Sequence, residues 1–256
     1  MAAPRVRPRD RRPSLAGIGT FIISRYPYIF AFVLLMLFAE RAEQQRSEGY
    51  ARGYIYSNIA ALFVLGTLII FDWQKHTAYL LCAVQVAIHA FYTHTSPYLH
   101  FGEWLTIRIV TRNFAVIGGY LMLASRELEN IPRRFKKPLL FTTGRYVYGF
   151  FLLCYSYTLF RSKEDNRAFH KLVPLGNLFS FVMVALTAVG AGSFFSGIRL
   201  RTAARVLLVV LIVTTLYFEG NINYWWRQRF VEYWMHILIL SESIVAIAVL
   251  MLLCYH

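Results

Sequence analysis

The sequence predicts an all-α integral membrane protein with about eight transmembrane helices, arranged as two parallel four-helix repeats. Three observations predict this fold class. Hydrophobic residues make up 57% of the 256 residues and charged residues only 16%, whereas soluble domains carry about 25% charged residues. The mean hydropathy is +0.47, and apolar residues form runs of membrane-crossing length. Short motifs also recur between the two halves of the chain, as in membrane proteins built by internal duplication.

Polar segments separate the apolar runs, which we interpret as the eight spans. They are Ile18–Phe38, Tyr54–Phe71, Thr77–Tyr92, Ile109–Ser125, Tyr146–Phe160, Leu172–Phe195, Ala203–Phe218 and Tyr233–Tyr255. Several contain only about 16 residues, or about 24 Å of helix, against a hydrocarbon core of about 30 Å. Because short spans suit a thinner bilayer, the sequence favours the endoplasmic reticulum or another endomembrane.

A shared spacing indicates the duplication. Glu103, in a Phe-Gly-Glu-Trp segment, lies eighteen residues before Leu121, which opens Leu-Met-Leu. Glu232, in a Phe-Val-Glu-Tyr segment, lies eighteen residues before Leu250, which opens a second Leu-Met-Leu. Packing alone does not require this match. Four spans per unit is an even number, so the two repeats enter the membrane in the same orientation.

Lysine and arginine residues divide and orient the chain. We expect a basic cytosolic arm at 1–17, a first membrane repeat at 18–125, a basic cytosolic linker at 126–142 and a second repeat at 143–256. By the positive-inside rule, this distribution places both termini in the cytosol. The net charge of +14 does not predict nucleic-acid binding, because the basic residues flank apolar runs instead of forming a soluble domain.

Charged and polar side chains near membrane depth are the candidate ligand-binding or partner-binding residues. A carboxylate at this depth is costly unless it is paired or hydrated. If the duplication holds, Glu103 with Arg112 and Glu232 with Glu242 line equivalent lumen-facing vestibules. Anchoring at the membrane interface is the alternative for Glu103 and Glu232, since tryptophans nearby suit an aromatic belt. The complete candidate set is Glu40, Arg41, Glu103, Trp104, Arg112, Asn113, Glu219, Glu232 and Glu242.

Other chemistry finds little support in the sequence. His89, His94, His100 and Glu103 lie near one another, but their spacing matches no zinc motif. The chain has no nucleophile elbow, phosphate-binding glycine loop or metalloprotease motif. We therefore expect no enzymatic activity, metal or cofactor, and an acid–base enzyme acting on a lipid is the less favoured alternative. The expected partners are the lipid bilayer and a client protein or lipid.

Seven ordered motifs carry a resemblance to a known family. They are Leu35–Glu43, Tyr98–Leu105, Ala115–Ser125, Ser162–Asp165, Glu219–Trp225, Val231–Trp234 and Glu242–Ser243. Over most of its length the chain resembles the transmembrane protein 101 family. More distantly, Arg112–Ala124 is similar to the fourth span of the DoxX-like superfamily. Gly144-Arg145 is similar to the opening of the second half of the surfeit-locus cargo receptor of the endoplasmic reticulum. These similarities imply tandem four-helix bundles.

The resemblance also implies two functions. The family is associated with activation of NF-κB signalling, which implies a non-enzymatic positive modulator whose signalling partner is unknown. Its candidate contact surface is the basic cytosolic set Arg133, Arg134, Lys136 and Lys137. The similarity to the cargo receptor implies the alternative, a client receptor or lipid-binding chaperone of the early secretory pathway that uses paired lumenal carboxylates.

Overall fold

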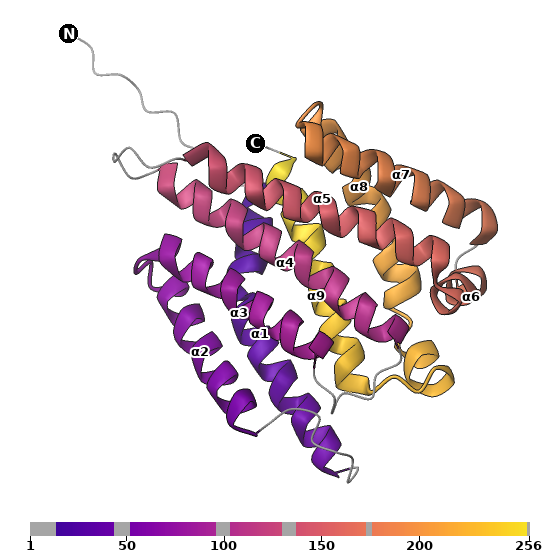
Figure 1. Cartoon of the computed structure of the whole chain (residues 1–256), viewed down its shortest axis with the longest axis horizontal. Helices are drawn as coiled ribbons and strands as arrows, with labels where there is room; N and C mark the ends of the chain where they lie inside the picture. Colours follow the sequence, from indigo (N-terminus) through magenta and orange to yellow (C-terminus); the bar gives the residue numbers. More distant parts are fainter. Residues whose placement is uncertain (1–13, 44–51, 96–102, 130–136, 173–175, 255–256) are drawn as a thin grey trace.

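The regular secondary structure is helical throughout the part of the chain that the computed structural model describes, residues 14–43, 52–95, 103–129, 137–172 and 176–254. Figure 1 shows the helices as a layered bundle, with the described chain ending in α9. The α-helices are α1 (Leu15–Glu43), α2 (Arg52–Ile70), α3 (Lys75–Thr95), α4 (Glu103–Glu129), α5 (Lys137–Arg161), α6 (Lys163–Leu172), α7 (Gly176–Ser196), α8 (Leu200–Thr214) and α9 (Tyr233–Leu253). Two π-helical turns, η1 (Thr215–Glu219) and η2 (Tyr224–Gln228), lie between α8 and α9.

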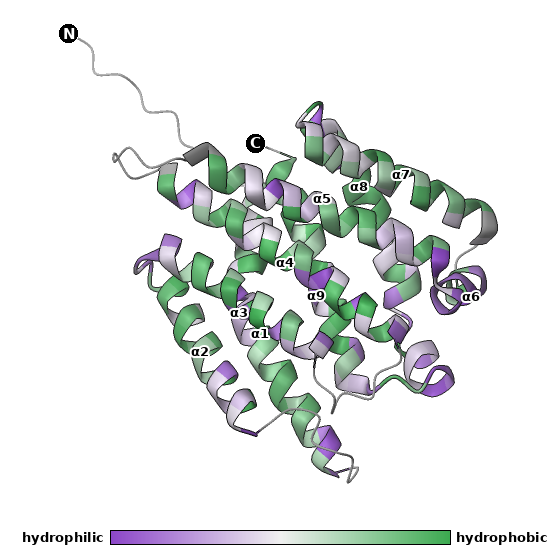
Figure 2. Ribbon diagram, viewed as in Figure 1, coloured by the Kyte–Doolittle hydropathy of each residue, from purple (hydrophilic) through white to green (hydrophobic). Residues whose placement is uncertain are grey.

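Among the residues that the structure describes, six helices are long and apolar enough to cross a membrane, in agreement with the predicted all-helical membrane protein. They are α1, α2, α4, the Leu178–Ser196 part of α7, α8 continued through η1 to Glu219, and α9. Figure 2 shows hydrophobic residues along most of these helices, whereas hydrophilic residues gather on α6 and around η2. α3 and α5 have 21 and 25 residues but a more polar composition.

α4 and α5 are longer than the apolar runs predicted within them. The predicted span Ile109–Ser125 lies inside α4, which has 27 residues, and the predicted span Tyr146–Phe160 lies inside α5, which has 25. The first of these spans was predicted to begin after the polar residue Arg108, but the fold buries this side chain and the helix continues through it. The short apolar runs therefore do not set the lengths of α4 and α5, and an endomembrane location stays a prediction.

A short polar helix, α6, was missed by the sequence reading. The predicted span Leu172–Phe195 begins with residues of α6 and continues as the separate helix α7. α6 has acidic residues in its first turn and basic residues in its last, which suits the helix dipole. It buries Asp165, Ala168 and Phe169 on one face. It packs against α7, α5 and η1, at the end of the bundle where α4 begins (Figure 1).

Two helix pairs carry the most extensive packing: α4 against α5, and α1 against α9. Their crossings are close because small residues face each other. A Cβ atom at Gly118 of α4 would lie 2.8 Å from the carbonyl oxygen of Gly144 on α5. A Cβ atom at Gly19 of α1 would collide with the carbonyl oxygen of Ala248 on α9. α4 and α9 also contact each other, so the two pairs form one continuous core.

We predict that Gly118→Ala destabilises the protein by about 1–3 kcal/mol, because the added methyl group meets backbone atoms that move only if α4 and α5 separate. Gly192→Ala on α7 is the matched control, since a Cβ atom there meets nothing within 4 Å. Thermal unfolding in detergent measures both variants. Equal melting temperatures for the two would contradict the close packing of α4 on α5.

Candidate functional site

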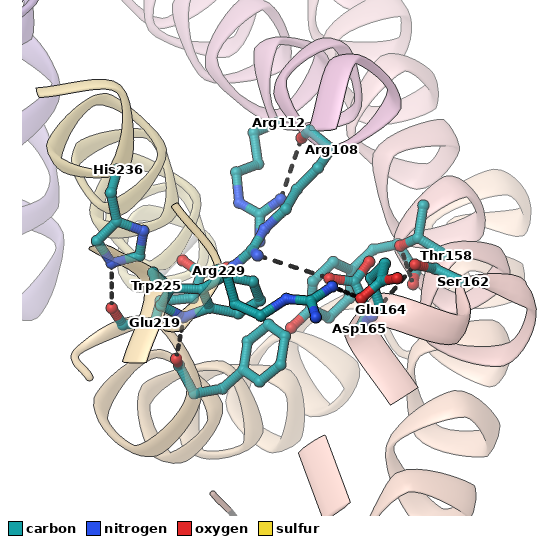
Figure 3. A network of polar contacts seen from close by, with 12 residues as sticks. Arg108, Arg112, Thr158, Ser162, Glu164, Asp165, Glu219, Trp225, Arg229 and His236 are labelled. Atoms are coloured by element: carbon teal, nitrogen blue, oxygen red, sulfur yellow. Dashed lines mark hydrogen bonds and ion pairs between the residues drawn. The ribbon is translucent and has the colours of Figure 1, made fainter. Parts of the chain in front are cut away.

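Four buried charged side chains form an ion network at the end of the bundle (Figure 3). Arg108 and Arg112 lie one turn apart on α4 and therefore point from the same face. Arg112 pairs with Glu219 at the end of η1. Arg108 Nη1 lies 3.5 Å from Asp165 Oδ1 on α6, and its Nη2 lies 3.5 Å from Glu219 Oε1. We call Arg108, Arg112, Asp165 and Glu219 the arginine network. Its two positive and two negative charges balance.

Further contacts hold both guanidinium groups in place. Arg112 donates from Nε to Ser243 Oγ of α9 at 2.9 Å and from Nη1 to the carbonyl oxygen of Arg108 at 3.0 Å. The Arg108 guanidinium carbon lies 4.0 Å from the ring centroid of Trp225 and 4.9 Å from that of Phe218. Arginine stacked on aromatic faces gains cation–π attraction, which is stronger when the pair is desolvated.

The π-helical turns position the aromatic and acidic members. Trp225 in η2 donates from Nε1 to the carbonyl oxygen of Phe218 in η1 at 2.8 Å. His236 of α9 donates from Nε2 to the carbonyl oxygen of Glu219 at 2.7 Å and stacks on Trp225, with ring centroids 5.9 Å apart. Irregular π turns are frequent at functional sites. Here they place the Glu219 carboxylate beside both arginines and the Trp225 ring against Arg108.

Glu242 and Asn113 lie deeper in the bundle and behave differently. Both side chains are fully buried, and neither carboxylate oxygen of Glu242 nor either amide atom of Asn113 has a hydrogen-bond partner in the described residues. The Tyr26 hydroxyl lies close enough to Glu242 to interact electrostatically. Among the described residues no basic side chain forms an ion pair with Glu242, and Arg112 pairs with Glu219.

Glu40, Arg41 and Glu232 join α1 to the beginning of α9. Arg41 donates from Nε and Nη2 to Glu232 Oε2, at 3.0 and 2.8 Å. Glu40 accepts the backbone N–H groups of Tyr233 and Trp234, each at 3.2 Å. A carboxylate that accepts N–H groups at a helix start satisfies free donors and suits the helix dipole. These three predicted site residues therefore hold two helices together.

Glu103 and Trp104 line a pocket of about 300 Å³ between the start of α4, the end of α5 and the start of α6. Glu103 is exposed and Trp104 is half-buried, and the Trp104 ring stacks on Trp225 with centroids 6.1 Å apart. We call this the Glu103 pocket. The described residues that line it are Glu103, Trp104, Ile107, Tyr157, Thr158, Arg161, Ser162, Lys163 and Glu164.

The structure groups the predicted residues differently from the two vestibules expected. Glu103 lines an open pocket, whereas Glu232, at the corresponding place before α9, is ion-paired to Arg41. Arg112 joins Glu219 instead of Glu103, and Glu242 lies buried away from the Arg41–Glu232 pair. The difference arises because α1 packs on α9 while α5 and α6 pack beside α4.

Sequence reasoning missed Arg108, Asp165, Trp225 and His236 as site residues. The spacing of Arg108 and Arg112 was an available signal, since two arginines four residues apart in an apolar run share one helix face. Of the basic cytosolic set, Arg133, Arg134 and Lys136 lie outside the described residues, and Lys137 begins α5. His100 also lies outside them. Among the residues described, no three His, Cys, Asp or Glu side chains form a group that could hold a metal.

We predict opposite effects for two conservative substitutions of buried carboxylates. Glu219→Gln breaks two ion pairs and leaves Arg108 and Arg112 sharing one negative charge, so it should destabilise the protein by about 3–5 kcal/mol. Glu242→Gln removes no ion pair, so it should leave the stability unchanged or raise it. Tryptophan fluorescence during thermal unfolding in detergent measures both. A loss for Glu242→Gln as large as that for Glu219→Gln would show that Glu242 carries an essential charge.

The family comparison covers almost the entire chain. The model of the TMEM101 protein family matches residues 12–256, which contain α1 to α9 and all the site residues above. No solved structure matches this chain. The match agrees with the resemblance drawn from the seven sequence motifs, five of which contain residues of the arginine network, the Glu103 pocket or the α1–α9 junction. The chain therefore belongs to the TMEM101 protein family.

Proposed function

We propose that this protein is a non-enzymatic membrane receptor or chaperone that binds a client segment or lipid in the Glu103 pocket. The observation that carries the proposal is the charge of the pocket lining. Glu103, Arg161 and Lys163 all line it, and none of the three has an ion-pair partner among the described residues. Glu164 in the same lining is paired with Arg229. Unpaired charges in a concave, aromatic-lined site favour recognition of a charged ligand group.

The packing supports a duplicated architecture of eight crossings, in which α3 and α5 cross the membrane with the six more apolar helices. In this proposal α1 to α4 form one unit and α5, α7, α8 and α9 form the other, with α6 inserted in the second. The first helix of each unit then packs on the last helix of the other, as α1 does on α9 and α5 on α4. The glycine contacts at Gly19 and Gly144 agree with this exchange.

The same symmetry makes the Glu103 pocket the open counterpart of a closed junction. Arg41 lies near the end of α1 and pairs with Glu232, just before α9. Arg161 ends α5 and lines the pocket with Glu103, at the start of α4. One crevice between units is therefore filled by an ion pair, while the equivalent crevice has room for a ligand.

In this proposal the pocket faces the side of the membrane where clients of a secretory receptor lie. An even number of crossings puts both termini on the same side, and the positive-inside rule favours the cytosol for both. The start of α4 then faces the lumen of the endoplasmic reticulum or another endomembrane. Trp225 links the pocket to the arginine network, because its ring contacts both Arg108 and Trp104.

Glu103→Gln should remove most ligand capture while leaving folding intact, because Glu103 is exposed and makes no ion pair within the described residues. A photo-crosslinking amino acid at Ile107 in the pocket lining, followed by mass spectrometry of captured peptides and lipids, measures the occupant in both backgrounds. Glu127→Gln, at the opposite end of α4, removes the same charge and is the control. Equal capture by the wild type and Glu103→Gln would contradict the proposal.

Positive modulation of NF-κB signalling, which the family resemblance of the sequence motifs implies, is the second candidate function. If the protein acts as a cytosolic scaffold, replacing Arg133, Arg134, Lys136 and Lys137 with glutamine should abolish the effect on a signalling reporter. If signalling depends on ligand capture, Glu103→Gln should abolish it and the basic replacements should not. The same reporter assay therefore separates the two functions.

A further inference from the structure

We infer that the Glu103 pocket receives the headgroup of a zwitterionic phospholipid, one that carries both a phosphate and an amine or quaternary ammonium group. This inference rests on the proposed function, since it names the chemical class of the ligand for the same pocket. Three features of the lining point to it: the number and sign of its unpaired charges, its aromatic side chains and the apolar surface beside its mouth.

The unpaired charges match a phosphate and an amine. Arg161 and Lys163 lie two residues apart across the end of α5 and the start of α6, and both line the pocket. Two cations suit a phosphate, which arginine binds with paired N–H donors and lysine binds as a point charge. Glu103 supplies the only unpaired carboxylate described in the lining. A ligand group of positive charge is therefore needed opposite the phosphate to match the whole site.

The aromatic lining suits the positive group of such a headgroup. Trp104 and Tyr157 both line the pocket, and tryptophan is the best aromatic partner for a cation, particularly a quaternary ammonium. Trp104 is held by its stacking on Trp225, which in turn contacts Arg108 in the arginine network. The aromatic surface beside Glu103 is thus positioned before any ligand binds.

The surface beside the pocket favours a lipid over a soluble peptide. Phe150, Leu153 and Tyr157 recur on one face of α5 at spacings of three and four residues, and all three are exposed. Ile107 on the adjacent helix α4 is also exposed and lines the pocket. In a helix that lies in a bilayer, an exposed apolar face contacts acyl chains. A phospholipid can therefore place its headgroup in the pocket while its chains follow α5 into the membrane.

The Arg41–Glu232 ion pair, which the proposed duplication relates to the Glu103 pocket, supplies a model for the bound state. There the Arg41 guanidinium and the Glu232 carboxylate neutralise each other directly. In the Glu103 pocket a zwitterion neutralises both Arg161 and Glu103. Its phosphate lies toward the arginine, and its amine or quaternary ammonium group lies toward the carboxylate. The ligand therefore bridges two side chains, Arg161 and Glu103, that form no ion pair with each other.

Native mass spectrometry of the full-length protein in detergent tests the inference with four probes of matched acyl chains: phosphatidylcholine, phosphatidylethanolamine, phosphatidylglycerol and diacylglycerol. We expect the wild type to bind the first two more tightly than phosphatidylglycerol, which has the phosphate but no amine, and to bind diacylglycerol least. Glu103→Gln should reduce the preference for the two lipids with a positively charged group by about tenfold, because phosphatidylethanolamine loses a charge-assisted hydrogen bond and phosphatidylcholine, which has no N–H donor, loses its ion pair with the carboxylate. The double substitution Arg161→Gln, Lys163→Gln should weaken the binding of all three lipids that carry a phosphate.

The controls are Glu127→Gln and Arg205→Gln, which remove charges at the other end of the bundle and should change no lipid preference. Tighter binding of phosphatidylglycerol than phosphatidylcholine, or an unchanged preference in Glu103→Gln, would overturn the inference while leaving lipid binding intact. Capture of peptides alone would overturn it in favour of a client segment. Binding of glycerophosphocholine as tight as that of the whole lipid would identify a soluble zwitterion instead. Absence of any pocket occupant would remove the proposed function itself.

Discussion

The arginine network is the interaction on which the rest of this structure depends. Between helices in a bilayer, apolar contact gives little net driving force or specificity, because lipid tails are as apolar as leucine. Buried charges impose a much stricter condition, since removing one partner leaves the other uncompensated. The four members of the network come from α4, α6 and η1. The network therefore ties α4, in the first half of the chain, to α6 and η1, in the second half.

The same network explains the shape of the region around the Glu103 pocket. α6, η1 and η2 are short and polar compared with the long helices, and isolated helices of such length are marginally stable. Each is tied down by a contact with a long helix or with a neighbour: Asp165 to Arg108, Glu219 to Arg112, and Lys171 of α6 to Gln228 of η2 at 2.7 Å. Trp225 in turn stacks on Trp104 and so holds this pocket side chain in position.

The sequence predicted an all-α membrane protein and the approximate position of each long helix described, because apolar composition and run length follow directly from residence in a bilayer. It did not predict α6 or the π turns, whose structure depends on burial of a few polar side chains by distant segments. Arg112 and Glu219 were identified as site residues from their depth, but their pairing was not, because two residues 107 positions apart meet only once α4 and η1 both pack against α9. Equivalent sequence positions also hid different environments, open for Glu103 and ion-paired for Glu232.

That difference follows from how the two equivalent helix ends continue. α1 extends two residues past Arg41 to Glu43, and Glu40 accepts the first N–H groups of α9, so Arg41 is held facing Glu232. α5 ends at Arg161, and α6 begins at Lys163 after a single intervening residue. α6 directs its own carboxylate Asp165 to Arg108 and Glu164 to Arg229, which leaves Arg161 and Glu103 on facing sides of a gap. On the proposed duplication, insertion of one polar helix thus replaces a structural ion pair with an open pocket, because the two charges are kept while the contact between them is removed.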